Sequence, residues 1–255
     1  MSAAPLDWII PDWPAPSWVL AGSTTRSGGV SNGVYASLNL GDHVGDEPNA
    51  VAKNRALLQE LAQLPTQPAW LQQVHGTDIL QLAQWRGEVC AADASLSSAP
   101  AEVCVVMTAD CLPVLFCCPQ TRQVAAAHAG WRGLCDGILE KTLAHFQNPA
   151  DVLIWLGPCI GPTAFEVGEE VRQQFLSKHA AAASAFSQGA LPGKWLANLT
   201  ELARIRLRSA GAEAIYGGDR CTVSEPEHFF SYRRDGQTGR MASYICMLAD
   251  PNKPS

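Results

Sequence analysis

Charged residues are scarce in this chain: Asp, Glu, Lys and Arg make up 16% of its 255 residues, against 47% hydrophobic residues. Long disordered segments are typically rich in charge and poor in hydrophobic residues, so this composition argues against them. No run of Lys or Arg is present, and the formal net charge is −6. The sequence therefore lacks the basic surface that binds nucleic acid. We expect no nucleic-acid partner and one globular domain over residues 1–255.

Long apolar runs are absent as well. The best candidate, residues 103–118, is interrupted by Asp110 and Pro113, whereas a membrane-spanning helix needs roughly 18 consecutive apolar residues. The first twenty residues contain no basic segment before an apolar stretch, so they do not resemble a signal peptide. Nine cysteines, an odd number, are more typical of reduced thiols than of a disulfide framework. We expect a cytoplasmic protein with no membrane partner and, without any sign of an oligomer, a monomer.

Short runs of alternating apolar residues, bounded by Gly, Pro or polar clusters, predict strands over residues 18–23, 69–74, 79–82, 103–108, 114–117, 124–128, 152–156 and 243–248. Helical patterns are predicted over residues 47–64, 136–146, 168–178 and 195–210. Asp46 is the predicted N-cap of the first helix, Gly211 ends the last, and the alanine-rich residues 180–185 are predicted to be a spacer. Several strands follow each other without a helix between them, which favours mixed sheets over a doubly wound parallel sheet.

Three segments combine the end of a predicted strand with chemically able side chains. They are residues 73–76 with His75, residues 108–113 with Asp110 and Cys111, and residues 128–133 with His128. Loops at strand ends bring together side chains from distant parts of a chain. Two His and one Cys suit Zn²⁺ or Cu⁺ and leave one coordination position open, where bound water can reach a pKa of about 7.

Two other interpretations of these side chains stay open on the residues alone. No short ligand motif such as CxxC or HExxH joins them, and a histidine after a strand is often only a hydrogen-bonding residue. Alternatively, Cys111 could be a nucleophile with His75 or His128 as its base, which needs no metal. The aromatic and Arg-rich residues 229–235 could stack on a planar base or form a surface hairpin.

Six motifs in order resemble the laccase-domain family, also called the multicopper polyphenol oxidase or purine nucleoside phosphorylase family. They are residues 37–46 (SLNLGDHVGD), 73–76 (QVHG), 108–113 (TADCLP), 128–133 (HAGWRG), 157–161 (GPCIG) and 230–234 (FSYRR). The resemblance implies an α+β fold of four layers, α/β/β/α, with mixed sheets, similar to the catalytic domain of a bacterial deamidating toxin. It also implies that His75, Cys111 and His128 bind zinc.

The family is credited with phosphorolysis of adenosine, inosine and methylthioadenosine, adenosine deamination, copper-dependent phenol oxidation and editing of peptidoglycan precursors. Six histidines are too few for a multicopper oxidase. A single metal with an open position suits attack on a purine, although the HxE and PCxxC signature of zinc deaminases is absent. We predict a zinc-dependent purine nucleoside phosphorylase and adenosine deaminase. The alternatives are a Cys/His hydrolase of peptidoglycan precursors, with Cys111 as nucleophile and His128 as base, and a copper-dependent phenol oxidase.

In this prediction, His75, Cys111 and His128 form both the metal site and the catalytic centre, with copper as the alternative metal. Asp110 is the fourth predicted catalytic residue, orienting a ligating histidine or relaying a proton. The substrates are a purine nucleoside and phosphate. Their predicted contacts are Asn39, Arg55, Gln73 and Arg132, which rest on the resemblance together with the general chemistry of arginine.

Overall fold

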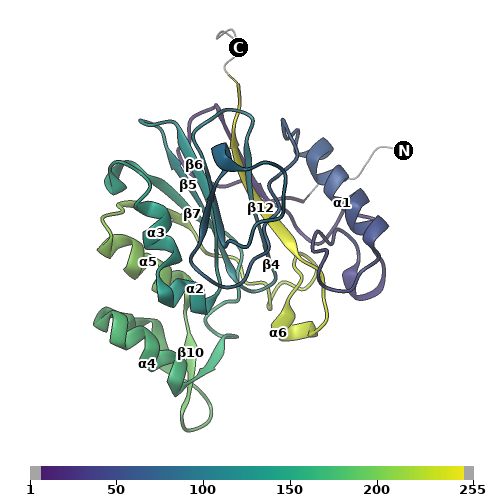
Figure 1. The fold of residues 1–255 in the computed structure, drawn as a ribbon. Helices are drawn as coiled ribbons and strands as arrows, with labels where there is room; N and C mark the ends of the chain where they lie inside the picture. The colour runs from purple at the N-terminus through teal and green to yellow at the C-terminus, as the bar shows by residue number, and fades with distance from the viewer. Residues whose placement is uncertain (1–6, 250–255) are drawn as a thin grey trace.

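Two β-sheets packed face to face form the centre of the computed structural model, which describes residues 7–249 (Figure 1). The smaller sheet is antiparallel, in the order β1 (Val19–Ser23), β12 (Met241–Met247), β4 (Val103–Thr108). The larger sheet has the order β11 (Ala214–Gly217), β7 (Leu153–Leu156), β5 (Leu112–Cys118), β6 (Gln123–Ala129), β3 (Ala94–Ser97), β2 (Ile79–Gln81). Its two outermost pairs, β11–β7 and β2–β3, are parallel and the rest antiparallel, so the sheet is mixed.

Helices cover the outer faces of both sheets. The smaller sheet carries α1 (Pro48–Leu61), while α2 (Trp131–Asp136), α3 (Ile138–Leu143) and α5 (Leu199–Ser209) lie on the larger one (Figure 1). A third sheet, of β8 (Glu166–Gly168), β10 (Lys194–Ala197) and β9 (Phe186–Gln188), packs with α4 (Glu169–Lys178). The short α6 (Tyr232–Asp235) lies near the lower edge of the smaller sheet in Figure 1. The layers follow the predicted order α/β/β/α, and the predicted α+β fold with mixed sheets is confirmed.

Apolar residues on both faces of the strands explain this layering. In β5, Leu115 faces the space between the sheets, where it packs with the smaller sheet, whereas Phe116 faces the helices. On the far side of the smaller sheet, Val105 and Tyr244 pack against Leu58 of α1. A strand buried on both faces reads as a continuous apolar run, and these runs are why β4, β5 and β6 are recognisable in the sequence.

Most predicted strands are confirmed to within two residues, but the one at residues 69–74 is wrong. This segment forms only isolated bridges, from Ala69 to Cys104 and from Gln72 to Ala91. Because its hydrogen bonds change partner after a few residues, no ladder develops. Strands at residues 94–97, 166–168, 186–188 and 214–217 were not predicted; each of them has only three or four residues.

The helix predictions need four corrections. The helix predicted at 195–210 begins as strand β10, and α5 starts only after Asn198, whose side chain accepts a hydrogen bond from the Glu201 N–H. The helix predicted at 136–146 is shorter: α3 begins only after Gly137, which has φ 99°, and ends at Leu143, while Asp136 belongs to α2. Glu47, not Asp46, is the N-cap of α1. The predicted spacer at 180–185 is a 3-10 helix with Ala182 and Ala185 buried.

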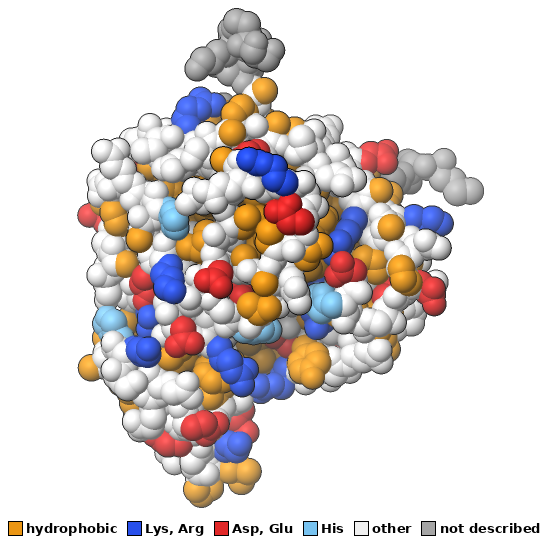
Figure 2. Space-filling view, in the orientation of Figure 1, with side chains coloured by type: hydrophobic (Ala, Val, Ile, Leu, Met, Phe, Trp, Pro, Cys, Tyr) orange, Lys and Arg blue, Asp and Glu red, His pale blue; other side chains and the backbone are white. Residues whose placement is uncertain are grey.

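The C-terminal aromatic segment is not a surface hairpin. Phe229 and Phe230 are fully buried, and the chain then turns into α6. All nine cysteines lie within the described residues, and none of them forms a disulfide. Among residues 7–249, no helix has the length and apolarity that crossing a membrane requires. On the face shown in Figure 2, basic and acidic side chains are interspersed, with no continuous basic patch.

Candidate metal centre

The register of the larger sheet brings two of the three predicted ligands together. Pro113 in β5 pairs with His128 in β6, so Cys111, just before β5, lies beside the end of β6. His75 comes from the turn that precedes β2. The ligand atoms of these three side chains all lie within 4.8 Å of one another, and Cys111 Sγ is 3.7 Å from His75 Nε2. The structure thus brings together the three residues that the sequence analysis selected, from three separate segments.

A buried carboxylate that the sequence analysis missed holds both histidines in place. Asp93 is 0% exposed, and its Oδ1 accepts hydrogen bonds from His128 Nδ1, at 2.7 Å, and from the His75 N–H, at 3.0 Å. Its Oδ2 accepts from the N–H groups of Gly76, at 2.6 Å, and Val74, at 3.2 Å. Because Nδ1 of His128 donates to Asp93, its Nε2 is left to bind a metal. The only signal in the sequence was an acid among small apolar residues, which must find hydrogen-bond donors if it is buried.

Cys111 is poised to be a thiolate. Burial by itself would raise the pKa of this thiol. The charges and hydrogen bonds of His128 and His75 lower the pKa by more than burial raises it, so it falls to about 6. Burial lowers the pKa of His128, but the neighbouring Cys111 and the bond to Asp93 raise it well above the usual value. The thiolate is the form of cysteine that attacks an electrophile or binds a metal.

Backbone conformation around the cluster is unusual. His75 (φ 60°) and Asp110 (φ 91°) both adopt left-handed conformations, which are costly for residues other than glycine and cluster at functional sites. At Gly130, a Cβ would lie 2.5 Å from His75 Cδ2 and 3.2 Å from Cys111 Sγ. Only glycine leaves room there for both ligands.

The cluster could hold a metal ion. Two imidazoles and a thiolate form a borderline-soft donor set of the kind found in catalytic zinc sites and in copper sites. Among residues 7–249, no second group of three or more His, Cys, Asp or Glu side chains is arranged to bind a metal.

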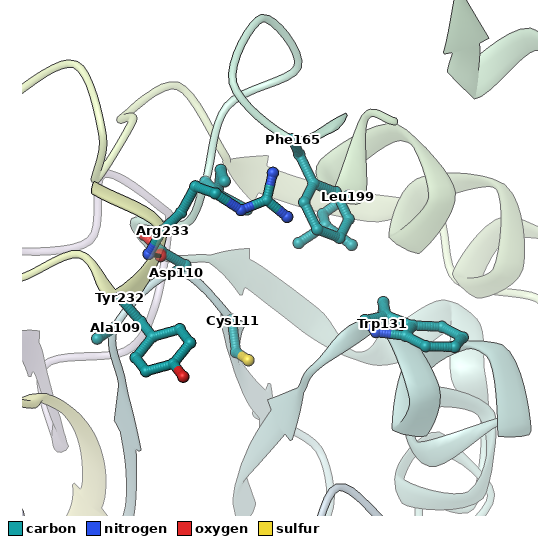
Figure 3. A pocket seen from close by; sticks show the side chains of 9 residues that line it. Ala109, Asp110, Cys111, Trp131, Phe165, Leu199, Tyr232 and Arg233 are labelled. Atoms are coloured by element: carbon teal, nitrogen blue, oxygen red, sulfur yellow. Dashed lines mark hydrogen bonds between the residues drawn. The ribbon is translucent and has the colours of Figure 1, made fainter. Parts of the chain in front are cut away.

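Two cavities meet at Cys111. The larger, of about 330 Å³, is the more polar of the two, and we call it the polar cavity. It is lined by the three cluster residues together with His43, Gln73, Met107, Thr108 and Arg240. The smaller, of about 140 Å³, is apolar and is lined by Trp131, Ile160, Phe165, Leu199, Asp110 and Arg233. Ala109, Cys111 and Tyr232 line both. Figure 3 shows Tyr232 on one side of the Cys111 sulfur and Trp131 on the other, with Phe165 and Leu199 above. A ligand that occupied both cavities would therefore pass directly over the cluster.

Three of the four predicted substrate contacts line neither cavity. Asn39 is 0% exposed and uses its amide on Gly41, Asp46 and the Arg240 N–H. Arg55 donates to the Leu40 carbonyl, pairs with Asp42 at 3.3 Å and stacks on Trp70. Arg132 is exposed and stacks on Trp131. These contacts occupy Asn39 and Arg55 within the protein.

Gln73, the fourth, does line the polar cavity, but its amide exchanges two hydrogen bonds with the Met107 backbone, at 2.7 and 2.8 Å. The carboxylate of Asp110 accepts hydrogen bonds from Thr222 Oγ1 and the Arg233 N–H, both at 2.6 Å. Asp110 therefore connects, through these hydrogen bonds, the loop that carries Cys111 to the C-terminal segment. The carboxylate that contacts a ligating histidine is Asp93.

The family model described as multi-copper polyphenol oxidoreductase laccase matches residues 20–248, and the chain belongs to this family, as predicted. It is 56% identical over 244 residues to purine nucleoside phosphorylase YfiH of Escherichia coli, covering 94% of this chain and 98% of the relative. A purine nucleoside phosphorylase of Pseudomonas aeruginosa is 53% identical over 239 residues, covering 93% and 97%. The crystal structure of a Neisseria meningitidis protein of the DUF152 family has the same fold, with a TM-score of 0.91 at 49% identity, covering 95% of this chain and all of the other.

Proposed function

We propose that this protein is a zinc-dependent purine nucleoside enzyme that cleaves adenosine, inosine and methylthioadenosine with phosphate and deaminates adenosine. The observation that carries the proposal is the position of the His75, Cys111 and His128 cluster, at the point where a polar and an apolar cavity meet. The relatives named purine nucleoside phosphorylase support the substrate class.

Zinc is the metal that the donor set fits best, with copper as the alternative. When bound, zinc supplies a Lewis acid and, at its open position, a water molecule whose pKa falls to about 7. His75 Nε2, Cys111 Sγ and His128 Nε2 would hold the ion. Asp93 would orient the ring of His128 and hold the backbone of His75 in place. Phenol oxidation of the laccase type uses several coupled coppers, whereas residues 7–249 arrange one His/Cys group of this kind.

The apolar cavity suits a purine base, because Trp131, Phe165 and Tyr232 offer aromatic surface on which a planar ring can stack. With the base there, the ribose lies near Cys111. In phosphorolysis, a phosphate oxygen forms a bond to ribose C1′ as the bond from C1′ to N9 breaks. The electron pair of the C1′–N9 bond leaves with the base, which takes up a proton. In deamination, water adds at C6 of adenine and ammonia leaves, which requires a second pose with the base, rather than the ribose, beside the cluster.

One geometric observation favours a second candidate, a thiol hydrolase acting on peptidoglycan precursors. Asp93, His128 and Cys111 are arranged as acid, base and nucleophile, with the acid 2.7 Å from His128 Nδ1. This order matches the Cys/His nucleophiles of metal-free hydrolases, in which a third residue orients the base. Such an enzyme would attack its substrate through the Cys111 sulfur and would not need zinc.

Metal content and nucleoside turnover, measured together, test the proposal. Wild type and Cys111→Ala are purified from a host that lacks its own nucleoside enzymes, and adenosine and inosine are supplied with and without phosphate. Cys90→Ala, which removes a thiol outside the cluster, is the matched control. We expect one zinc per chain in wild type and the control. Cys111→Ala should lose most of the metal and at least a hundredfold in turnover.

The outcome separates the candidates. Dependence of base release on phosphate identifies phosphorolysis, and inosine formation from adenosine without phosphate identifies deamination. If chelation of the metal leaves activity on cell-wall precursors intact and wild type does not convert nucleosides, the thiol hydrolase replaces the nucleoside enzyme.

A further inference from the structure

Within the described part of the chain, Arg240 is the one arginine or lysine that lines the polar cavity beside the cluster. Its Nη1 donates to the carbonyl oxygens of Thr238 and Gly239, each at 3.0 Å. Among residues 7–249, its Nε and Nη2 donate to no other group, yet neither atom is sealed from solvent. One edge of the guanidinium is thus held by the protein while the other is available to a ligand in the cavity.

The surrounding residues are built to place this arginine. Asn39 Oδ1 accepts a hydrogen bond from the Arg240 N–H at 2.9 Å, and the Leu40 N–H donates to the Arg240 carbonyl at 3.1 Å. Gly41 lets the side chain pass, because a Cβ there would lie 2.7 Å from Arg240 Cγ. Residues 39–41 belong to the SLNLGDHVGD motif, so this motif acts on the cavity through Arg240. His43, from the same motif, lines the cavity directly and adds an exposed ring.

We propose that Arg240, with His43 at the rim, binds the phosphate co-substrate in the polar cavity. This inference rests on the proposed function and replaces Arg55 and Arg132 as the anion-binding residues. A guanidinium with two donors on one edge matches two oxygens of a phosphate, which is the arrangement that makes arginine a strong phosphate ligand. Asn39 is a positioning residue for Arg240.

The charged groups around the polar cavity favour binding of an anion only when a metal ion occupies the cluster. Cys111 and Asp110 bring negative charge near Arg240. A divalent ion on the cluster would offset the charge of Cys111 and Asp110, so that Arg240 could pair with an anion instead. Phosphate in the polar cavity and a base in the apolar cavity would then lie on opposite sides of Cys111, as the transfer of ribose from base to phosphate requires.

Phosphate binding to the zinc-loaded chain, measured by calorimetry, tests the assignment without relying on activity. Arg240→Gln removes the positive charge. Arg240→Lys keeps the charge but replaces the planar pair of N–H donors with a single ammonium group. Arg208→Gln, on the exposed surface of α5, makes the same charge change away from both cavities. We expect Arg240→Gln to bind inorganic phosphate about 10- to 100-fold more weakly and Arg240→Lys about tenfold more weakly. Arg208→Gln should match wild type.

Kinetics provide the second measurement. In Arg240→Gln the KM for phosphate should rise by the same factor, while the KM for the nucleoside changes less than about threefold and the zinc content stays the same. If Arg240→Gln does not fold, Arg240→Lys gives the same comparison. The assignment is overturned if wild type does not bind phosphate or if a folded Arg240 variant binds it as tightly as wild type. If Arg240 governs phosphate binding but no nucleoside is cleaved, the phosphate site stands and the proposed function fails.

Discussion

The carboxylate of Asp93 allows a direct test of how the candidate metal centre is held together. In Asp93→Asn the side chain keeps its shape but has one acceptor oxygen instead of two. Whichever way the amide turns, either His128 and His75 or Gly76 and Val74 face an NH₂ group in place of an oxygen. The less costly orientation keeps the oxygen toward the histidines, because Val74 is exposed and can bind water instead.

Two effects follow, and both can be given a size. A buried donor without a partner costs about 1–3 kcal/mol, so the loss at the Gly76 N–H, with a smaller one at Val74, should lower the free energy of unfolding by about 2 kcal/mol. Loss of the carboxylate behind His128 should also weaken metal binding by about 10- to 100-fold, which corresponds to about 1.4–2.8 kcal/mol.

The assay is a competition titration of zinc against a chromophoric chelator, paired with denaturant unfolding of the metal-free chain. Asp78→Asn is the matched control, since Asp78 is exposed and accepts hydrogen bonds from the Asp93 and Ala94 N–H groups through its backbone carbonyl, which the substitution keeps. The control should stay within experimental error of wild type in both measurements. If Asp93→Asn binds zinc within about threefold of wild type and unfolds at the same midpoint, Asp93 does not orient the ligands.

Two further substitutions test the space around the metal-binding cluster and the stacking of a base in the apolar cavity. Gly130→Ala places a methyl 2.5 Å from His75 Cδ2, so it should weaken zinc binding at least about tenfold in the same titration; wild-type affinity would show that the ligands can move aside. Tyr232→Leu should raise the KM for a purine nucleoside by about 5- to 150-fold, because stacking on a base is worth about 1–3 kcal/mol. Tyr232→Phe, its control, should stay within about threefold, and equal behaviour of the two variants would argue against stacking.

Local patterns were sufficient where burial is simple. Strands β4, β5 and β6 lie in the middle of the packed layers, and their continuous apolar runs predict them from the sequence. The pattern was insufficient at residues 195–210, because Trp195 and Leu196 fit a strand and a helix equally well. There the side chain of Asn198 decides where the helix begins. At residues 69–74 the apolar pattern was right about burial but could not show that the segment changes hydrogen-bond partners.

The sequence by itself determined which chemistry this protein can support, since two histidines and a cysteine beside strand ends are able to bind a metal wherever the fold brings them together. Only the tertiary structure decided how they are used. The pairing of Pro113 with His128 sets the distance to Cys111, and Asp93 reaches the histidines across segments that are far apart in the chain. Nothing in the sequence distinguishes Arg55 from Arg240. In the structure, Arg55 pairs with Asp42 and stacks on Trp70, whereas Arg240 lines the cavity. A side chain's charge is a property of its type, whereas its availability to a ligand depends on burial and on partners that only the folded chain supplies.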